Sequence, residues 1–420
     1  MLFIFVSVLN ISCTNEVLVS DDHTETNKLN VIKKDINEYF DNANMFTSDD
    51  IQSLINILEI LDSDIYGKEI IFTAESHGIK DNQILEIEFI KYFKKKNDFK
   101  YLLCEIPYSD SHYINKYLET EDETILNDLY SGVNLTDYSS KEQYNVWIQI
   151  NELNKTLSDN DKIKVIGVDI ESNIINAYRF LVDILPAKDA PEKIKPQIML
   201  VKETLDMVET TFTKDYIAEK NAKLILEDIE ENLDLYEEYF GENLVYFELV
   251  NQNIVNSKEA YKYNSNFIEF SKYRDKMIYD NFLVLDEVLP KGKYYGQWGY
   301  SHALQSIEGD KLWFGTYLNS NESTYKGKVL SIVYNYEDCI KMGTGGRKDF
   351  EYNFIYPFIN EITDKHTSKY TLYKLNGNEA DRPFIPMIDK FTGEELDQDI
   401  NQFLQYVLLI RESVASESLD

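Results

Sequence analysis

The segment Lys68–Lys80, KEIIFTAESHGIK, joins an apolar run to a short polar turn, and a helical pattern begins after it near Asp81. The apolar run Ile70–Phe72 predicts a buried strand, and the turn that follows carries Glu75 and His77. A strand, a turn and a helix in this order place the turn at the carboxyl end of a strand, where open α/β sheets build their sites. A carboxylate and an imidazole two residues apart can reach one water molecule, so we interpret this turn as part of a site. The alternative is that His77 caps the helix while Glu75 faces solvent.

Ionisable residues follow three more predicted strands: Phe99–Cys104 is followed by Glu105, Lys162–Val168 by Asp169, and Lys293–Gln297 by a turn that contains His302. Helical patterns lie between these strands. Continuous apolar strands separated by helices are typical of a parallel sheet that is buried on both faces. We therefore predict an α/β fold with a mainly parallel central sheet that helices cover on both faces.

The remaining segments complete this prediction. Residues 187–265 show no clear strand pattern but contain long helical repeats rich in Glu and Lys, which predicts a helical insertion or cap. Further strands are expected at Lys328–Tyr334 and Tyr370–Tyr373, then a closing helix over Glu394–Leu409 and a frayed carboxyl terminus. We expect residues 31–410 to form one domain.

The composition limits the classes of partner. The chain has 420 residues, of which 43% are hydrophobic, as is typical of a globular protein. It contains 42 Lys and Arg against 74 Asp and Glu, which gives a net charge of −32. Nucleic acid is bound by clustered Lys and Arg that neutralise phosphates, so this acidic balance argues against nucleic acid as a partner.

The amino terminus is similar to a bacterial lipoprotein signal. The apolar stretch Leu2–Leu9 is too short to span a bilayer and is followed by the small residue Ser12 and then by Cys13. We expect residues 1–13 to form the signal, with lipid attached to the Cys13 thiol, and residues 14–30 to form a flexible tether. This predicts a protein of the bacterial cell envelope, lipid-anchored or secreted, which meets the membrane only through Cys13. A misassigned start is the alternative.

Five ionisable residues follow predicted strands: Glu75, His77, Glu105, Asp169 and His302. Because the carboxyl ends of parallel strands share one edge of a sheet, we predict that these side chains converge on one polar site. No Ser or Cys stands in a nucleophile-elbow frame such as G-x-S-x-G, so a water molecule activated by a His or Glu base is favoured. The same residue types bind divalent metals, although their spacing matches no standard zinc motif. Loop polarity and helix capping are the alternative, above all for Asp169.

Three blocks of the sequence resemble the erythromycin esterase family. Ala74–Gly78 is similar to the family's G-E-x-x-H-G turn, and Leu102–Glu105 is similar to its strand that ends in a site Glu. Tyr273–Phe282 is similar to the family's R-D-x-x-M-x-x-N-L helix, and a strand and His302 follow it. The order and rough spacing of these blocks agree over residues 65–335.

The resemblance implies an α/β core with a helical cap and a deep cleft, in which a His-activated water opens an ester or a macrolide lactone. His77 would be the base. Glu75 and Glu105 would orient His77 or the water, and His302 would be a second imidazole at the site.

Three further residues would support this site. By resemblance, Arg274 and Asp275 would pair near the cleft or brace the cap. Asp169, at the end of its predicted strand, is counted with them as a supporting residue. The expected function is hydrolysis of a small-molecule ester or lactone with no required cofactor.

Two alternatives to this function stay open. One is a metal-dependent hydrolase or peptidase in which Glu75, His77 and His302 hold a divalent metal. The other is a ligand-binding lipoprotein without catalytic activity.

Overall fold

The structure, a computed structural model, describes residues 36–40, 44–130, 140–210, 214–343, 345, 347–362, 367–379 and 381–419. The predicted signal, the lipidation site Cys13 and the predicted tether lie outside these residues, so the envelope location stays a prediction from the sequence. Within the described residues, no helix is both long enough and apolar enough to cross a membrane.

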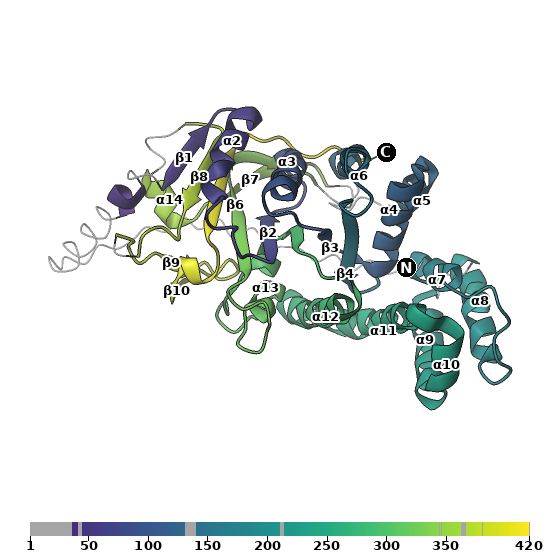
Figure 1. The fold of residues 1–420 in the computed structure, drawn as a ribbon. Coiled ribbons are helices and arrows are strands. Elements are labelled where there is room, and N and C mark those ends of the chain that lie inside the picture. Colours follow the sequence, from purple (N-terminus) through teal and green to yellow (C-terminus); the bar gives the residue numbers. More distant parts are fainter. Residues whose placement is uncertain are drawn as a thin grey trace.

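A sheet of nine strands forms the centre of the described part of the chain (Figure 1). Six neighbouring strands run parallel, in the order β11, β6, β2, β5, β3, β4. Their bounds are Tyr406–Arg411, Val329–Lys341, Ile70–Glu75, Tyr294–Gly299, Tyr101–Pro107 and Lys164–Asp169. The structure therefore confirms the predicted mainly parallel α/β sheet.

Antiparallel strands extend the sheet at one side. β8 (Tyr370–Lys374) pairs with β11, and β1 (Met45–Ser48) pairs with β8. β7 (Phe350–Phe354) pairs with the far end of β6. A separate hairpin consists of β9 (Pro386–Ile388) and β10 (Glu395–Asp399).

Helices cover both faces of the sheet, because the parallel strands bury alternate side chains on opposite sides. One apolar core includes Ile71 and lies under helices on one face: α2 (Ile51–Ile57), α3 (Lys80–Lys96), α4 (Tyr108–Thr120), α5 (Glu123–Tyr130) and α6 (Lys141–Lys155). The other core includes Phe72 and lies against α12 (Phe267–Val288) and α13 (Phe314–Leu318). A short helix, α14 (Pro357–Ile362), also packs against this second core.

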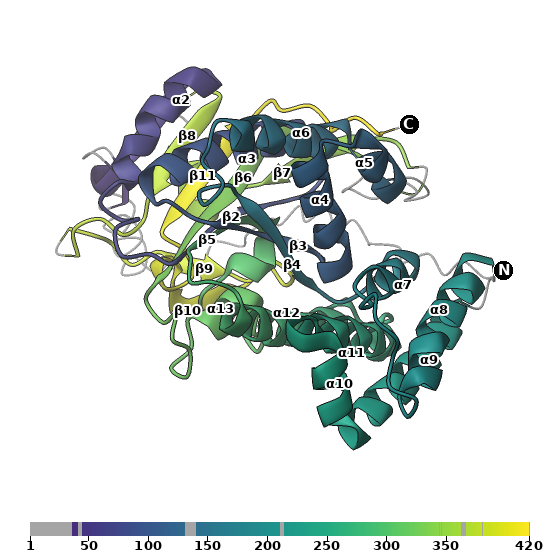
Figure 2. The ribbon, with the colours of Figure 1, turned by 45° about the vertical axis from the view of Figure 1, so that its right-hand side comes forward.

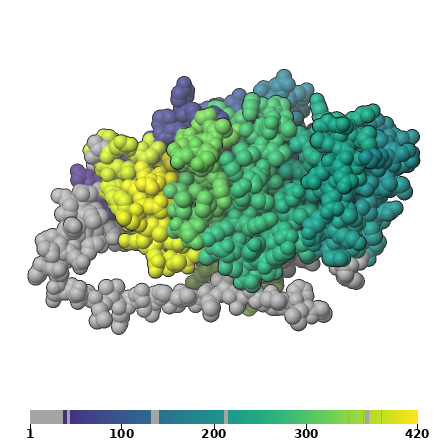
Figure 3. All heavy atoms as spheres, turned by 90° about the horizontal axis from the view of Figure 1, so that it is seen from below, coloured from purple at the N-terminus to yellow at the C-terminus, as the bar shows by residue number. Residues whose placement is uncertain are grey.

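A long helical connection joins β4 to β5. It consists of α7 (Ile174–Asp183), α8 (Lys195–Thr210), α9 (Lys214–Glu231), α10 (Leu233–Phe240), α11 (Leu244–Ala260) and α12. The first five of these helices share an apolar core of their own and stand beside the sheet, whereas α12 runs back along it (Figure 2). Seen from below, this connection forms one end of the surface and the carboxyl-terminal segments form the other (Figure 3).

The predicted closing helix over Glu394–Leu409 is wrong. This region forms β10, a short turn and β11, and β11 lies between β6 and β8 inside the sheet. A strand that is buried on both faces reads as a continuous apolar run rather than as an alternating one, and such a run is easily mistaken for a buried helix. The predicted frayed end is also wrong, because Ala415 and Ser418 form β-bridges with Ile79 and Ser140.

The position of β11 can be tested by comparing two truncations. Leu408→Ala is expected to lower the free energy of unfolding by about 2–5 kcal/mol, because it removes a fully buried side chain from the helix-covered core. Val414→Ala, beyond the end of β11, removes an exposed side chain and should change the free energy by about 0.5 kcal/mol or less. Urea unfolding measures both values. Equal, small losses would contradict the central position of β11.

Candidate active site

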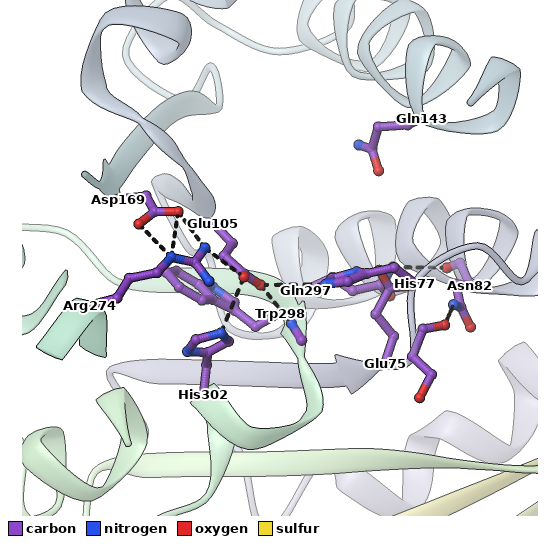
Figure 4. Close-up of polar contacts among 12 residues, drawn as sticks. Glu75, His77, Asn82, Glu105, Gln143, Asp169, Arg274, Gln297, Trp298 and His302 are labelled. Atoms are coloured by element: carbon purple, nitrogen blue, oxygen red, sulfur yellow. Dashed lines mark hydrogen bonds and ion pairs between the residues drawn. The ribbon is translucent and has the colours of Figure 1, made fainter. Parts of the chain in front are cut away.

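The predicted site residues meet where four neighbouring strands end. β2 ends at Glu75, β5 ends at Gly299 just before His302, and β4 ends at Asp169. β3 carries Glu105 two residues before its end, and all four strands are adjacent in the sheet. The close-up shows these side chains on one edge of the sheet, together with Arg274 from α12 (Figure 4).

His77 is held by the carboxylate of Glu75. The distance between His77 Nδ1 and Glu75 Oε1 is 2.7 Å. Because a carboxylate only accepts hydrogen bonds, we assign the ring proton to Nδ1, which leaves the lone pair on Nε2. The other oxygen of Glu75 accepts a hydrogen bond of 3.2 Å from the side-chain amide of Gln297. The His77 side chain is 24% exposed, whereas that of Glu75 is 6% exposed, so a fixed carboxylate orients a base that solvent can reach.

Glu105 lies at the centre of the charged residues. Its Oε1 accepts hydrogen bonds from Arg274 Nη2 at 2.8 Å and from His302 Nε2 at 3.2 Å. Its Oε2 accepts the backbone N–H of Gly299 at 2.8 Å and lies 3.9 Å from Nε2 of His77. Burial alone would raise the pKa of Glu105, but the positive charges of His302 and Arg274 hold that pKa well below its usual range. Glu105 is therefore an ionised carboxylate that faces the base.

His302 is a buried imidazolium between two carboxylates. Its Nδ1 lies 2.8 Å from Asp275 Oδ1, and its Nε2 contacts Glu105. Burial lowers the pKa of His302, but the charges and hydrogen bonds of Asp275 and Glu105 outweigh it and raise the pKa to about 10. His302 thus carries a positive charge at neutral pH and is not available as a base.

Arg274 and Asp275 are successive residues on α12 and bind different partners. Arg274 Nε donates to both carboxylate oxygens of Asp169, at 2.8 and 3.1 Å, and its Nη2 contacts Asp169 as well as Glu105. Asp275 accepts from the backbone N–H of Phe314 at 2.7 Å in addition to its bond with His302. The structure thus brings all seven predicted site residues together, but it does not pair Arg274 with Asp275.

Sequence reasoning did not identify Gly299. A Cβ added at this position would lie 3.2 Å from His77 Nε2, 3.2 Å from Glu105 Oε2 and 3.3 Å from His302 Cδ2. The glycine therefore leaves open the point on which three site residues converge. Its place at the end of β5, directly before the turn that carries His302, was the available signal.

The carboxyl-terminal tail holds the turn that carries His77. The carbonyl oxygen of Gly78 accepts hydrogen bonds from the backbone N–H groups of Met342, at 2.8 Å, and Ser416, at 3.1 Å. Glu417 adds an ion pair of 3.0 Å with Lys80 at the start of α3. This contact could not be predicted from the sequence, because it depends on where the tail returns to the sheet.

The alternative metal-ligand set consists of Glu75, His77 and His302. Glu75 contacts His77, and the carboxylate of Glu105 lies between His77 and His302. Across the described part of the chain, no three His, Cys, Asp or Glu side chains are arranged to hold a metal ion.

The charge state of His302 depends on Asp275. Asp275→Asn keeps a hydrogen-bond acceptor but removes the charge, so the pKa of His302 should fall from about 10 towards its ordinary value of 6.5. The raised pKa adds stability that is complete below pH 6.5 and is lost as pH rises through about 10, and the variant should lack this contribution. Ring-nitrogen NMR of His302 measures the shift, with His112 as the internal control. An unchanged titration of His302 would contradict the assigned ion pair.

Comparisons with known proteins establish the fold. No family model matches the sequence, and no curated protein matches it. A solved structure of a Bacillus cereus protein is similar, with a TM-score of 0.67 and 18% identity over 93% of this chain and 99% of that chain. A succinoglycan biosynthesis protein is similar with a TM-score of 0.65 and 15% identity, over 95% of this chain and 100% of its own.

An open-conformation mutant of the erythromycin esterase EreC is also similar, with a TM-score of 0.65 and 12% identity over 90% of this chain and 99% of that chain. At such low identities, the likeness concerns the path of the backbone and not the chemistry. The chain therefore has the fold that these three structures share, which is a scaffold used by at least one hydrolase.

Proposed function

We propose that this protein hydrolyses an ester or a lactone with a water molecule that His77 activates. The arrangement of Glu75, His77 and Glu105 carries the proposal: one carboxylate fixes the tautomer of the base, and the other faces its unprotonated nitrogen. The solved erythromycin esterase with this fold supports ester hydrolysis as the reaction class.

The attacking water would lie between His77 and Glu105. Nε2 and Oε2 are 3.9 Å apart, and a water molecule about 2.8 Å from both atoms fits this separation. Such a water donates one proton to Nε2 and the other to Oε2, which leaves an oxygen lone pair for a carbonyl carbon. Glu105 is suited to this role because its neighbours keep it ionised.

The proton then moves through His77. As the water oxygen bonds to the carbonyl carbon, Nε2 takes its proton, and Glu75 stabilises the imidazolium that forms. When the carbon–oxygen bond to the alcohol breaks, Nε2 returns the proton to the leaving oxygen. The products are a carboxylic acid and an alcohol, which remain joined if the substrate is a lactone. Arg274 and His302 contact the Glu105 oxygen that does not face His77. Their positive charges offset the negative charge that develops in the transition state.

Replacing the base tests this proposal. In a panel of simple esters, lactones and macrolides, His77→Ala should lose about 100-fold or more in kcat, because proton transfer by a positioned base is removed. His112→Ala is the matched control, because this half-buried His lies on α4 against Phe180 and contacts none of the site residues named above. Full turnover by folded His77→Ala would refute the role of this base, and turnover that follows a bound divalent metal would favour the metal-dependent alternative.

Gly299→Ala tests the position of the water. Its backbone has φ −56° and ψ 141°, which alanine adopts without strain, but the new Cβ would fill the point between His77 and Glu105. We expect a loss of about 10-fold to 100-fold in kcat, because the water is displaced, and at most a small decrease in the unfolding temperature, because the neighbouring side chains must shift slightly. Wild-type kcat in this variant would show that the water attacks from elsewhere.

A further inference from the structure

A ribbon made of β6 and β7 forms a wall beside the turn that carries His77. β6 pairs with β2 along its first residues and then continues past the end of β2, where β7 pairs with it. On β7, Tyr352 and Phe354 are half-buried and the residue between them is exposed, so the two rings share the inner face of the ribbon. The Tyr352 hydroxyl lies 2.6 Å from the hydroxyl of Ser76, the residue directly before His77. The aromatic wall therefore borders the proposed site.

Two lysines lie over the aromatic rings of this wall. The ammonium nitrogen of Lys390 is 4.3 Å from the centre of the Tyr300 ring and 5.0 Å from the centre of the Phe354 ring. Tyr300 directly follows the end of β5, so Lys390 lies beside the second turn of the site. The ammonium nitrogen of Lys341 is 5.4 Å from the centre of the Tyr352 ring. Aromatic faces attract cations but do not neutralise them, so both lysines keep a charge that another group can bind.

The two lysines have no carboxylate partner of their own. Among the described residues, none forms an ion pair with Lys341 or Lys390, although the chain contains 74 Asp and Glu against 42 Lys and Arg. The carboxylate of Glu308 acts on Lys390 from a distance, and its two oxygens accept the indole N–H of Trp313 and the backbone N–H of Lys390. Two ammonium groups and one carboxylate leave a single positive charge to be offset.

Lys390 is held in place by the turn between β9 and β10. Its backbone N–H donates to Glu308 at 3.1 Å. The preceding residue, Asp389, forms a buried ion pair of 2.6 Å with Lys311 and accepts the backbone N–H of Phe391 at 2.8 Å. A charge that is already positioned by its surroundings binds an opposite charge with less loss of conformational entropy.

We propose that Lys341 and Lys390 bind a carboxylate of the substrate, so that the preferred substrates are esters or lactones that carry a carboxylate on the β7 side of the scissile carbonyl. A carboxylate supplies the one negative charge that the wall requires, and the rings of Tyr300 and Phe354 offer apolar contact to the carbon skeleton that bears it. This inference rests on the proposed hydrolase function and specifies its substrate class.

The ionisation of Lys390 supports this assignment. Burial, together with the positive charge of Lys341, lowers the pKa of Lys390 to about 8. The ammonium form still predominates at neutral pH, but it lacks the stabilisation that water or a carboxylate would give it. A bound carboxylate would supply that stabilisation, whereas a neutral group of the same shape would not.

The test compares two acetate esters of equal shape and different charge, 4-acetoxybenzoate and 4-acetoxybenzamide. The wild type should show a kcat/KM for the anionic ester that is higher by about tenfold or more, because two ammonium groups attract its carboxylate. Lys390→Met keeps an apolar side chain over the rings and should reduce this ratio towards one. Lys341→Met is a second variant with the same expectation if Lys390→Met does not fold.

Lys100→Met is the matched control. Lys100 is also a half-buried lysine, 5.5 Å from the centre of the Tyr101 ring, but it lies at the start of β3, at the opposite edge of the sheet. This variant should keep the wild-type ratio. An equal loss of the ratio in Lys100→Met would show that the preference comes from the overall charge of the protein and would refute the assigned site.

Binding of 4-hydroxybenzoate, measured by calorimetry against 4-hydroxybenzamide, separates this inference from the hydrolase proposal. Preferential binding of 4-hydroxybenzoate that depends on Lys390, without hydrolysis of any ester or lactone in the panel, would keep the carboxylate site and refute the hydrolase. Equal hydrolysis of the two acetate esters, with no preference for 4-hydroxybenzoate, would keep the hydrolase and refute the carboxylate site.

Discussion

The site depends on keeping one buried carboxylate, that of Glu105, ionised. Removing a carboxylate from water is unfavourable unless positive charges and hydrogen-bond donors replace the water. Arg274, His302 and the backbone of Gly299 supply them, from α12, from the turn after β5 and from the end of β5. The Glu105 carboxylate that faces His77 is therefore also the group that three separate parts of the chain contact.

Two further ion pairs extend the network around Glu105, one through Arg274 and one through His302. Asp169 pairs with Arg274 on one side, and Asp275 pairs with His302 on the other, so each cation lies between two carboxylates. The apolar packing of α12 against the sheet stabilises the fold, but because it is non-directional it does not select one position of the helix along the sheet. Ion pairs are directional, and we infer that they fix α12 relative to the strand ends. The removal of one partner would leave a buried charge next to charges of the same sign, so we expect the residues of this network to act as a unit.

The sequence predicted the parts of the site that follow from strand order. Glu75, Glu105 and Asp169 follow apolar runs, and parallel strands bring their ends to one edge, so their convergence could be inferred. The separate partners of Arg274 and Asp275 could not, because they depend on the rotation of α12. The strand β11 was missed because a run buried on both faces has no alternating pattern.

In the proposed mechanism, water attacks the substrate directly, with no covalent intermediate on the protein. It is tested by a single turnover in ¹⁸O-labelled water, in which the protein is quenched at short times and its intact mass is measured together with that of the products. Direct attack by water should place ¹⁸O in the carboxylic acid and none in the alcohol, and should leave the mass of the protein unchanged at every time point. A transient protein mass increased by the acyl group would contradict it and would point to a nucleophilic side chain instead of the water held by His77 and Glu105.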